Sequence, residues 1–218
     1  MPTLEAIHWG PASKGQPRQL VILCHGLGAD AFDLIDLAHA WQHACPDALF
    51  AAVHAPFPHD SGMGRQWWSV ADRSPEVMEQ GVRTAAPYLH GFIDAELARL
   101  NLPDDAYAIM GFSQGAMMAL FAGLRRPPGH AIPRAILAYA GALLAPASLP
   151  AELSGRPPVL LVHGEDDDVV PPTRSREAET ALAASAVPVE AHTLPRLGHW
   201  LDEPGLALGA LALQRGFS

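Results

Sequence analysis

The sequence predicts an α/β protein with a mostly parallel central sheet that helices cover on both faces. Short continuous apolar runs recur along the chain, as expected for strands that are buried on both sides of a sheet. Longer segments with apolar residues at helical spacing separate these runs, and this alternation favours parallel strands. The 218 residues contain no linker, repeat or low-complexity tract, so a single domain over residues 1–218 is expected.

The apolar runs are the predicted strands. The first of them, QLVILCH at residues 19–25, is hydrophobic almost throughout and is followed by a glycine. In chain order, strands are expected at residues 19–25, 49–54, 106–111, 135–139, 159–163 and 187–194.

The segments between and after these strands are predicted to be helices. They are expected at residues 30–44, 75–100, 114–124, 172–185 and 203–214. In the longest, Ser74 and Pro75 are typical of a helix start, and Pro87 is expected to kink the helix or to divide it into two. Residues 55–73 form the one long irregular stretch, and loops of that length are often functional.

Composition excludes several classes of protein. The net charge is −9 and the 14 Lys and Arg residues are scattered, so no nucleic-acid partner is expected. The chain does not begin with a signal-peptide pattern, and its longest apolar stretch, residues 135–147, is too short to span a bilayer. Cys24 and Cys45 read as free, reduced thiols. We therefore expect a cytoplasmic protein without stable membrane insertion.

The motif Gly111-Phe112-Ser113-Gln114-Gly115 lies directly between a predicted strand and a predicted helix. A serine that stands exposed at the carboxyl end of a strand needs a sharp, strained turn, and only small residues fit two positions before and after it. Ser113 is therefore the predicted nucleophile. The alternative, a glycine-rich turn with an ordinary capping serine, does not require this strand and helix context.

A serine hydroxyl needs a base and an acid beside it, and in this kind of site they follow the serine in the order acid, then histidine. Four consecutive acids, residues 165–168, follow the predicted strand at 159–163, and spacing alone does not choose among them. His199 lies in a loop after the last predicted strand, where a base can reach the serine. His192 lies within that strand and is the less favoured candidate.

Acyl transfer also requires two hydrogen-bond donors directed at the developing oxyanion. The turn after the nucleophile supplies the backbone N–H of Gln114. The second donor is expected from the loop His25-Gly26-Leu27-Gly28, whose glycines let a backbone N–H turn towards the site, with Leu27 as the candidate.

Four motifs together resemble the phospholipase/carboxylesterase family, which includes acyl-protein thioesterases and small bacterial carboxylesterases. They are CHGLGAD at residues 24–30, GFSQGA at 111–116, HGEDDDVVP at 163–171 and Gly-His at 198–199. They occur in the family's order and extend from about residue 20 to the end of the chain.

The resemblance implies an α/β-hydrolase fold without a large cap domain, and it places the triad acid at Asp167. It also supports the Leu27 and Gln114 amides as the oxyanion hole. Family members often carry another glycine where this chain has Ala116. The loop after residue 55 usually holds substrate contacts and a tryptophan, so Trp67 or Trp68 is expected either to line an acyl pocket or to cover the core.

The function expected from these residues is hydrolysis of carboxylic esters or thioesters by a Ser113–His199–Asp167 triad. Substrates are small-molecule or lipid esters, and lysophospholipid is among those that fit. No cofactor and no metal is expected, because neither an H-E-x-x-H motif nor a calcium loop occurs. Some relatives pair across the active-site face, so a homodimer stays open. The alternatives are a non-catalytic module that binds hydrophobic ligands, and a perhydrolase or peptidase variant on the same fold.

Overall fold

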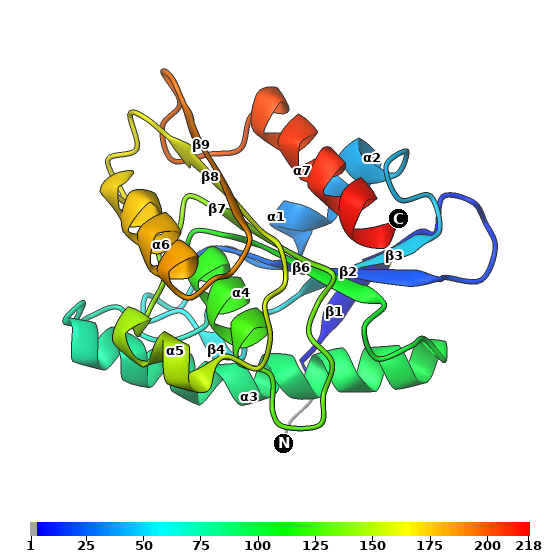
Figure 1. Cartoon of the computed structure of the whole chain (residues 1–218), viewed down its shortest axis with the longest axis horizontal. Helices are drawn as coiled ribbons and strands as arrows, with labels where there is room; N and C mark the ends of the chain where they lie inside the picture. Colours follow the sequence, from blue (N-terminus) through cyan, green and yellow to red (C-terminus); the bar gives the residue numbers. More distant parts are fainter. Residues whose placement is uncertain (1–3) are drawn as a thin grey trace.

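A computed structural model describes residues 4–218 and shows a seven-stranded sheet with helices on both faces (Figure 1). The strands lie in the order β1-β3-β2-β6-β7-β8-β9. β1 runs antiparallel to β3, and every other neighbouring pair is parallel. The strands of this sheet are β1 (Ala6–Trp9), β2 (Gln19–Cys24), β3 (Ala48–Val53), β6 (Tyr107–Phe112), β7 (Ala135–Tyr139), β8 (Val159–Gly164) and β9 (Val189–Leu194). The expected α/β-hydrolase fold is confirmed.

Two hydrophobic cores lie on opposite faces of the sheet. Along β2, Leu20 and Ile22 pack into one core, and Val21 and Leu23 pack into the other, as the two-residue period of a strand requires. Helices α3 (Pro75–Leu100), α4 (Gln114–Leu124), α5 (Leu149–Glu152) and α6 (Thr173–Ala184) cover the first core. Helices α1 (Phe32–Ile35), α2 (Leu37–Trp41) and α7 (Glu203–Phe217) cover the second, as Figure 1 shows.

All six predicted strands are present, with ends within two residues of those expected. The predicted helix at residues 114–124 and the strand at residues 135–139 match the structure at both ends. These elements have long apolar runs or are bounded by a glycine, so their ends can be predicted from the sequence.

The single helix expected at residues 30–44 is wrong, because two short helices, α1 and α2, occupy that segment. Backbone bonds with a spacing of three residues, from Leu34 N–H to Ala31 O and from His39 N–H to Asp36 O, tighten the chain here. Apolar residues at helical spacing cannot distinguish such tight turns from one regular helix.

The division of the helix at residues 75–100 is also wrong, because α3 continues through Pro87 without interruption. Proline removes one backbone donor, but the turns on both sides are packed against the core by Val82, Ala85, Leu89 and Ile93. Tertiary packing therefore outweighs the local helix-breaking tendency.

Four features have no counterpart in the prediction. They are the antiparallel edge strand β1, a small hairpin of β4 (Phe57–Pro58) and β5 (Arg65–Gln66) inside residues 55–73, a 3-10 turn, η1 (Pro146–Ser148), and the short helix α5 that follows it. Between β7 and β8 the chain carries only η1 and α5, so no large cap domain covers this edge of the sheet. None of the helices within residues 4–218 is long and apolar enough to cross a bilayer.

Candidate active site

Ser113 lies in the sharp turn between β6 and α4, with φ 56° and ψ −119°. A Cβ atom on Gly111 would stand 2.1 Å from the carbonyl oxygen of Gly115, and one on Gly115 would stand 1.9 Å from the carbonyl oxygen of Cys24. Both glycines are therefore required by close backbone packing, as the motif predicts. The left-handed backbone at a non-glycine residue is strained, and such strain is typical of functional sites.

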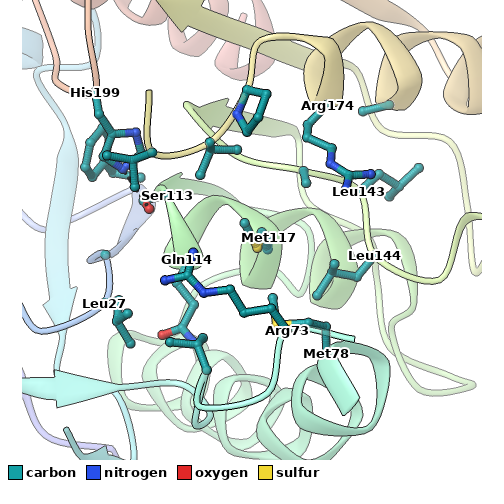
Figure 2. A pocket seen from close by; sticks show the side chains of 18 of the residues that line it. Leu27, Arg73, Met78, Ser113, Gln114, Met117, Leu143, Leu144, Arg174 and His199 are labelled. Carbon is teal, nitrogen blue, oxygen red and sulfur yellow. Dashed lines mark hydrogen bonds between the residues drawn. The ribbon is translucent and has the colours of Figure 1, made fainter. Parts of the chain in front are cut away.

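The structure brings Ser113, His199 and Asp167 into one hydrogen-bonded chain. The His199 Nε2 atom lies 2.9 Å from Ser113 Oγ, and its Nδ1 atom lies 2.7 Å from Asp167 Oδ2. A carboxylate only accepts, so Nδ1 carries the proton and Nε2 of the neutral ring accepts from the serine hydroxyl. Figure 2 shows His199 directly above Ser113 at one end of the pocket.

His192, the less favoured candidate for the base, takes no part in this series of hydrogen bonds. It lies on β9, and its Nε2 atom is 2.8 Å from Glu190 Oε1. The loop that carries Asp167 is hydrogen-bonded to the end of β9 and to the loop that follows it. The backbone N–H of Glu165 donates to the carbonyl of Leu194, and that of Asp166 donates to the carbonyl of Leu197. These bonds place the loop that carries His199 beside the acid.

Among the four consecutive acids, only Asp167 is buried. Its Oδ1 atom accepts the backbone N–H groups of Val169 and Val170, each at 2.9 Å. Burial would raise the pKa of Asp167, but the bonds from His199 and from these two amides lower it below its usual value. The side chain is therefore an ionised carboxylate at neutral pH.

A second histidine lies behind the acid and was not singled out from the sequence. His163, at the end of β8, is fully buried, and its Nε2 atom lies 2.8 Å from the carbonyl oxygen of Val170 and 3.2 Å from Asp167 Oδ2. Its Nδ1 atom lies 2.7 Å from Ser175 Oγ. The His-Gly pair that opens the acid motif was the signal for it, because a polar residue at the end of a buried strand needs partners.

The backbone N–H groups of Leu27 and Gln114 have no hydrogen-bond partner within residues 4–218, so both are able to donate to a bound group. The loop that carries Leu27 is held by His25, whose ring is buried. The His25 Nε2 atom accepts the Ala55 N–H at 3.0 Å, so Nδ1 carries the proton and donates to the carbonyl of Gly26 at 2.7 Å. Burial lowers the pKa of His25, which keeps the ring in this neutral form.

Trp67 and Trp68 do not line the pocket, so the expectation of an acyl-pocket role gives way to its alternative, a place in the core. The Trp67 indole N–H donates to the carbonyl of His25 at 3.0 Å. The Gln114 side chain accepts the Trp67 backbone N–H at 3.0 Å and donates to the Trp68 carbonyl at 2.8 Å. The Trp67 indole therefore supports the loop that carries Leu27 from behind, whereas the Trp68 indole N–H donates to the sulfur of Met78 at 3.4 Å.

A pocket of about 830 Å³ opens beside Ser113. Its walls are mainly apolar, and Figure 2 shows Met78, Met117, Leu143 and Leu144 extending along it away from the serine. Val70, in the irregular stretch at residues 55–73, also lines it. The described part of the chain, residues 4–218, contains no cluster of three or more potential metal ligands.

The comparisons with known proteins agree with this geometry. The sequence profile of a family described as Phospholipase/Carboxylesterase matches residues 11–208. Esterase YpfH of Escherichia coli is 29% identical over 89% of this chain and 82% of its own length. Acyl-protein thioesterase 1 of Schizosaccharomyces pombe is 34% identical over 69% of each chain. The crystal structure of esterase PE8 superposes with a TM-score of 0.91 at 35% identity, covering 98% of this chain and 99% of that one. This chain belongs to the phospholipase/carboxylesterase family of α/β hydrolases.

Proposed function

We propose that this protein is a serine carboxylesterase or thioesterase that works through an acyl-enzyme, with Ser113, His199 and Asp167 as its triad. The observation that carries the proposal is the unbroken hydrogen-bonded chain of these three side chains at the end of an apolar pocket. Two amides without a hydrogen-bond partner among residues 4–218 accompany the serine: that of Leu27, in the loop after β2, and that of Gln114, the first residue of α4. The combination supplies a nucleophile, a base and an oxyanion hole.

In the acylation step, His199 Nε2 takes the Ser113 proton as the serine oxygen attacks the carbonyl carbon of the ester. The Leu27 and Gln114 amides stabilise the oxyanion, and Asp167 stabilises the imidazolium that forms. His199 then gives its proton to the leaving alkoxide or thiolate as the acyl–oxygen or acyl–sulfur bond breaks. Water repeats the sequence on the acyl-enzyme and releases the carboxylic acid.

The substrate class follows from the pocket and from the relatives. Apolar walls suit an acyl chain or another hydrophobic group of a small-molecule or lipid ester. Relatives with the names esterase and acyl-protein thioesterase support both leaving groups. The two buried, free cysteines accord with the cytoplasmic location that we propose.

The test is hydrolysis of p-nitrophenyl esters from acetate to decanoate by wild type and by Ser113→Ala. Loss of the serine should lower kcat by several orders of magnitude, on the order of a millionfold at most. Near-normal turnover by Ser113→Ala would reject the nucleophile. If the folded wild type neither hydrolyses these esters nor reacts with a fluorophosphonate probe, the non-catalytic binding module becomes the better interpretation. Parallel assays with thioesters, amides and peracid formation separate the remaining alternatives.

A further inference from the structure

Five charged side chains line the active-site pocket, and their partners differ. They are Asp33, Arg73, Glu79, Arg174 and Glu177. Arg174 pairs with Glu177 at 3.0 Å, and Glu79 pairs with Arg83 outside the pocket at 2.8 Å. Asp33 accepts the backbone N–H of Asp30 at 2.9 Å. Each of these four groups therefore has a hydrogen-bond partner on the protein.

Arg73 is different, because none of the residues 4–218 provides a hydrogen bond or a carboxylate to its guanidinium. It lies just before α3, at the end of the irregular stretch at residues 55–73. Figure 2 shows its side chain extended along the pocket, with the guanidinium directed towards the end where Gln114 and Ser113 lie. Arg73 is an exposed residue, but its side chain lies along the apolar wall of the pocket and extends towards Ser113 (Figure 2).

A guanidinium that has no protein partner is matched best by a carboxylate, which it binds through two parallel hydrogen bonds. The chain carries a net charge of −9, so a free cation inside the pocket is a local exception that selects for anions there. Asp33, Glu79 and Glu177 lie at the same pocket and repel an anion, but Glu79 and Glu177 are neutralised by arginines. The remaining attraction is centred on Arg73.

We propose that the pocket selects esters that carry a carboxylate a few carbons from the scissile bond, such as half-esters of dicarboxylic acids, and that Arg73 binds this carboxylate. The inference rests on the proposed esterase function. The apolar wall of Met78 and Met117 receives the methylene chain between the two groups, and Arg73 receives its charged end. Arg73 is then a specificity-determining residue that takes no part in proton transfer.

The experiment compares two substrates that differ in one group. Monoethyl adipate is assayed beside its amide analogue, in which a neutral carboxamide replaces the free carboxylate. A second pair, 4-acetoxybutanoate and its amide, places the carboxylate on the alcohol side of the ester. Wild type should prefer the acid over the amide by about two- to fivefold in kcat/KM in one of the pairs, the size expected for an exposed charge pair.

Arg73→Gln should abolish this preference, so that kcat/KM for each acid falls to that for its amide analogue. Arg73→Lys should retain part of the preference, because the positive charge remains but the planar guanidinium that forms two parallel hydrogen bonds is lost. Arg174→Gln is the matched control, since that arginine lines the same pocket but already pairs with Glu177. Rising salt should weaken the wild-type preference and have no such effect in Arg73→Gln.

The outcomes separate this inference from the function on which it rests. Efficient hydrolysis of the neutral esters without any preference for the acids in either pair would overturn the role of Arg73 alone. The same is true of a preference that survives Arg73→Gln. If wild type hydrolyses none of these esters and does not react with a fluorophosphonate, the proposed esterase function fails, and the substrate assignment fails with it.

Discussion

Single residues around Asp167 show how the site controls charge. Its carboxylate accepts three hydrogen bonds, from two backbone amides and the His199 ring, so the buried negative charge is compensated. The His163 Nε2 atom, which donates to the Val170 carbonyl, lies 3.2 Å from the same carboxylate. Such a carboxylate can hold His199 in one tautomer and one orientation. Because the carboxylate is buried, its position depends on these neighbours and not on solvent.

The residue-scale prediction concerns His163, as a positioning residue that does not touch the substrate. His163→Ala should lower kcat by about tenfold with little change in KM, because it removes the donor to the Val170 carbonyl, at about 1–3 kcal/mol, and so loosens the loop that places Asp167. His163→Gln, whose side-chain N–H can occupy the Nε2 position, should recover part of that loss. Steady-state kinetics on one p-nitrophenyl ester measures both, with a thermal melt as the control for folding. Equal loss in the two variants would indicate a role in packing only.

At the scale of elements, the two amides that we propose as oxyanion donors come from different parts of the fold. Leu27 lies in the loop after β2, and Gln114 begins α4. The Gln114 side chain binds the backbone at Trp67 and Trp68, and the Trp67 indole binds the carbonyl of His25. This series of hydrogen bonds joins the two elements, so it sets the separation of the donors.

The element-scale prediction is therefore that Trp67→Phe damages the oxyanion hole. It removes the indole donor and leaves the His25 carbonyl buried without that partner. We expect kcat/KM to fall and affinity for a boronic-acid transition-state analogue to fall in parallel, while KM changes little. Trp68→Phe is the matched control, because that indole N–H donates to the sulfur of Met78 and not to the loop. Identical effects of both substitutions would contradict the link.

At the scale of the whole molecule, one ion-pair network holds the distal wall of the pocket. Glu152 on α5 accepts from Arg125 at 2.7 Å and from Arg83 on α3 at 2.9 Å. Arg125 also donates to the carbonyl of Ala145, in the segment that lines the pocket, at 2.8 Å. Both guanidinium groups lie over the Phe121 ring of α4, so the network joins three helices to the wall.

The network predicts a pH dependence of stability. Burial alone would raise the pKa of Glu152, but hydrogen bonds from Ser148, Arg125 and Arg83 lower it to about 2. A carboxyl whose folded pKa is depressed stabilises the folded state above its ordinary pKa, and that stabilisation is lost as pH falls towards the folded value. Wild type should melt at a higher temperature than Glu152→Gln at pH 7, and the difference should shrink between about pH 5 and pH 2. A difference that does not depend on pH would reject the ionic origin.

Some elements of the fold can be predicted from the sequence because a buried element has a recognisable local pattern of apolar residues. The parallel strands in the interior of the sheet, β2, β3, β6, β7 and β8, are buried on both faces, so each is a nearly continuous apolar run. The edge strand β1 is short and half-buried, and the hairpin of β4 and β5 has two residues in each strand, so neither has a comparable pattern. Pro87 misleads for the opposite reason: its local preference is strong, but distant packing overrides it.

The sequence by itself determined the order of strands and helices, the sharp turn at Ser113 and the candidates for its partners, because these depend on local spacing and on residue type. Spacing left four adjacent acids open and the family resemblance pointed to Asp167, but only the tertiary structure shows that Asp167 alone of the four is buried against His199, and that Trp67 and Trp68 face the core. It alone also revealed His163 behind the acid and a pocket cation without a partner. Burial and hydrogen bonding depend on residues that are distant along the chain, and no local pattern records which of them meet.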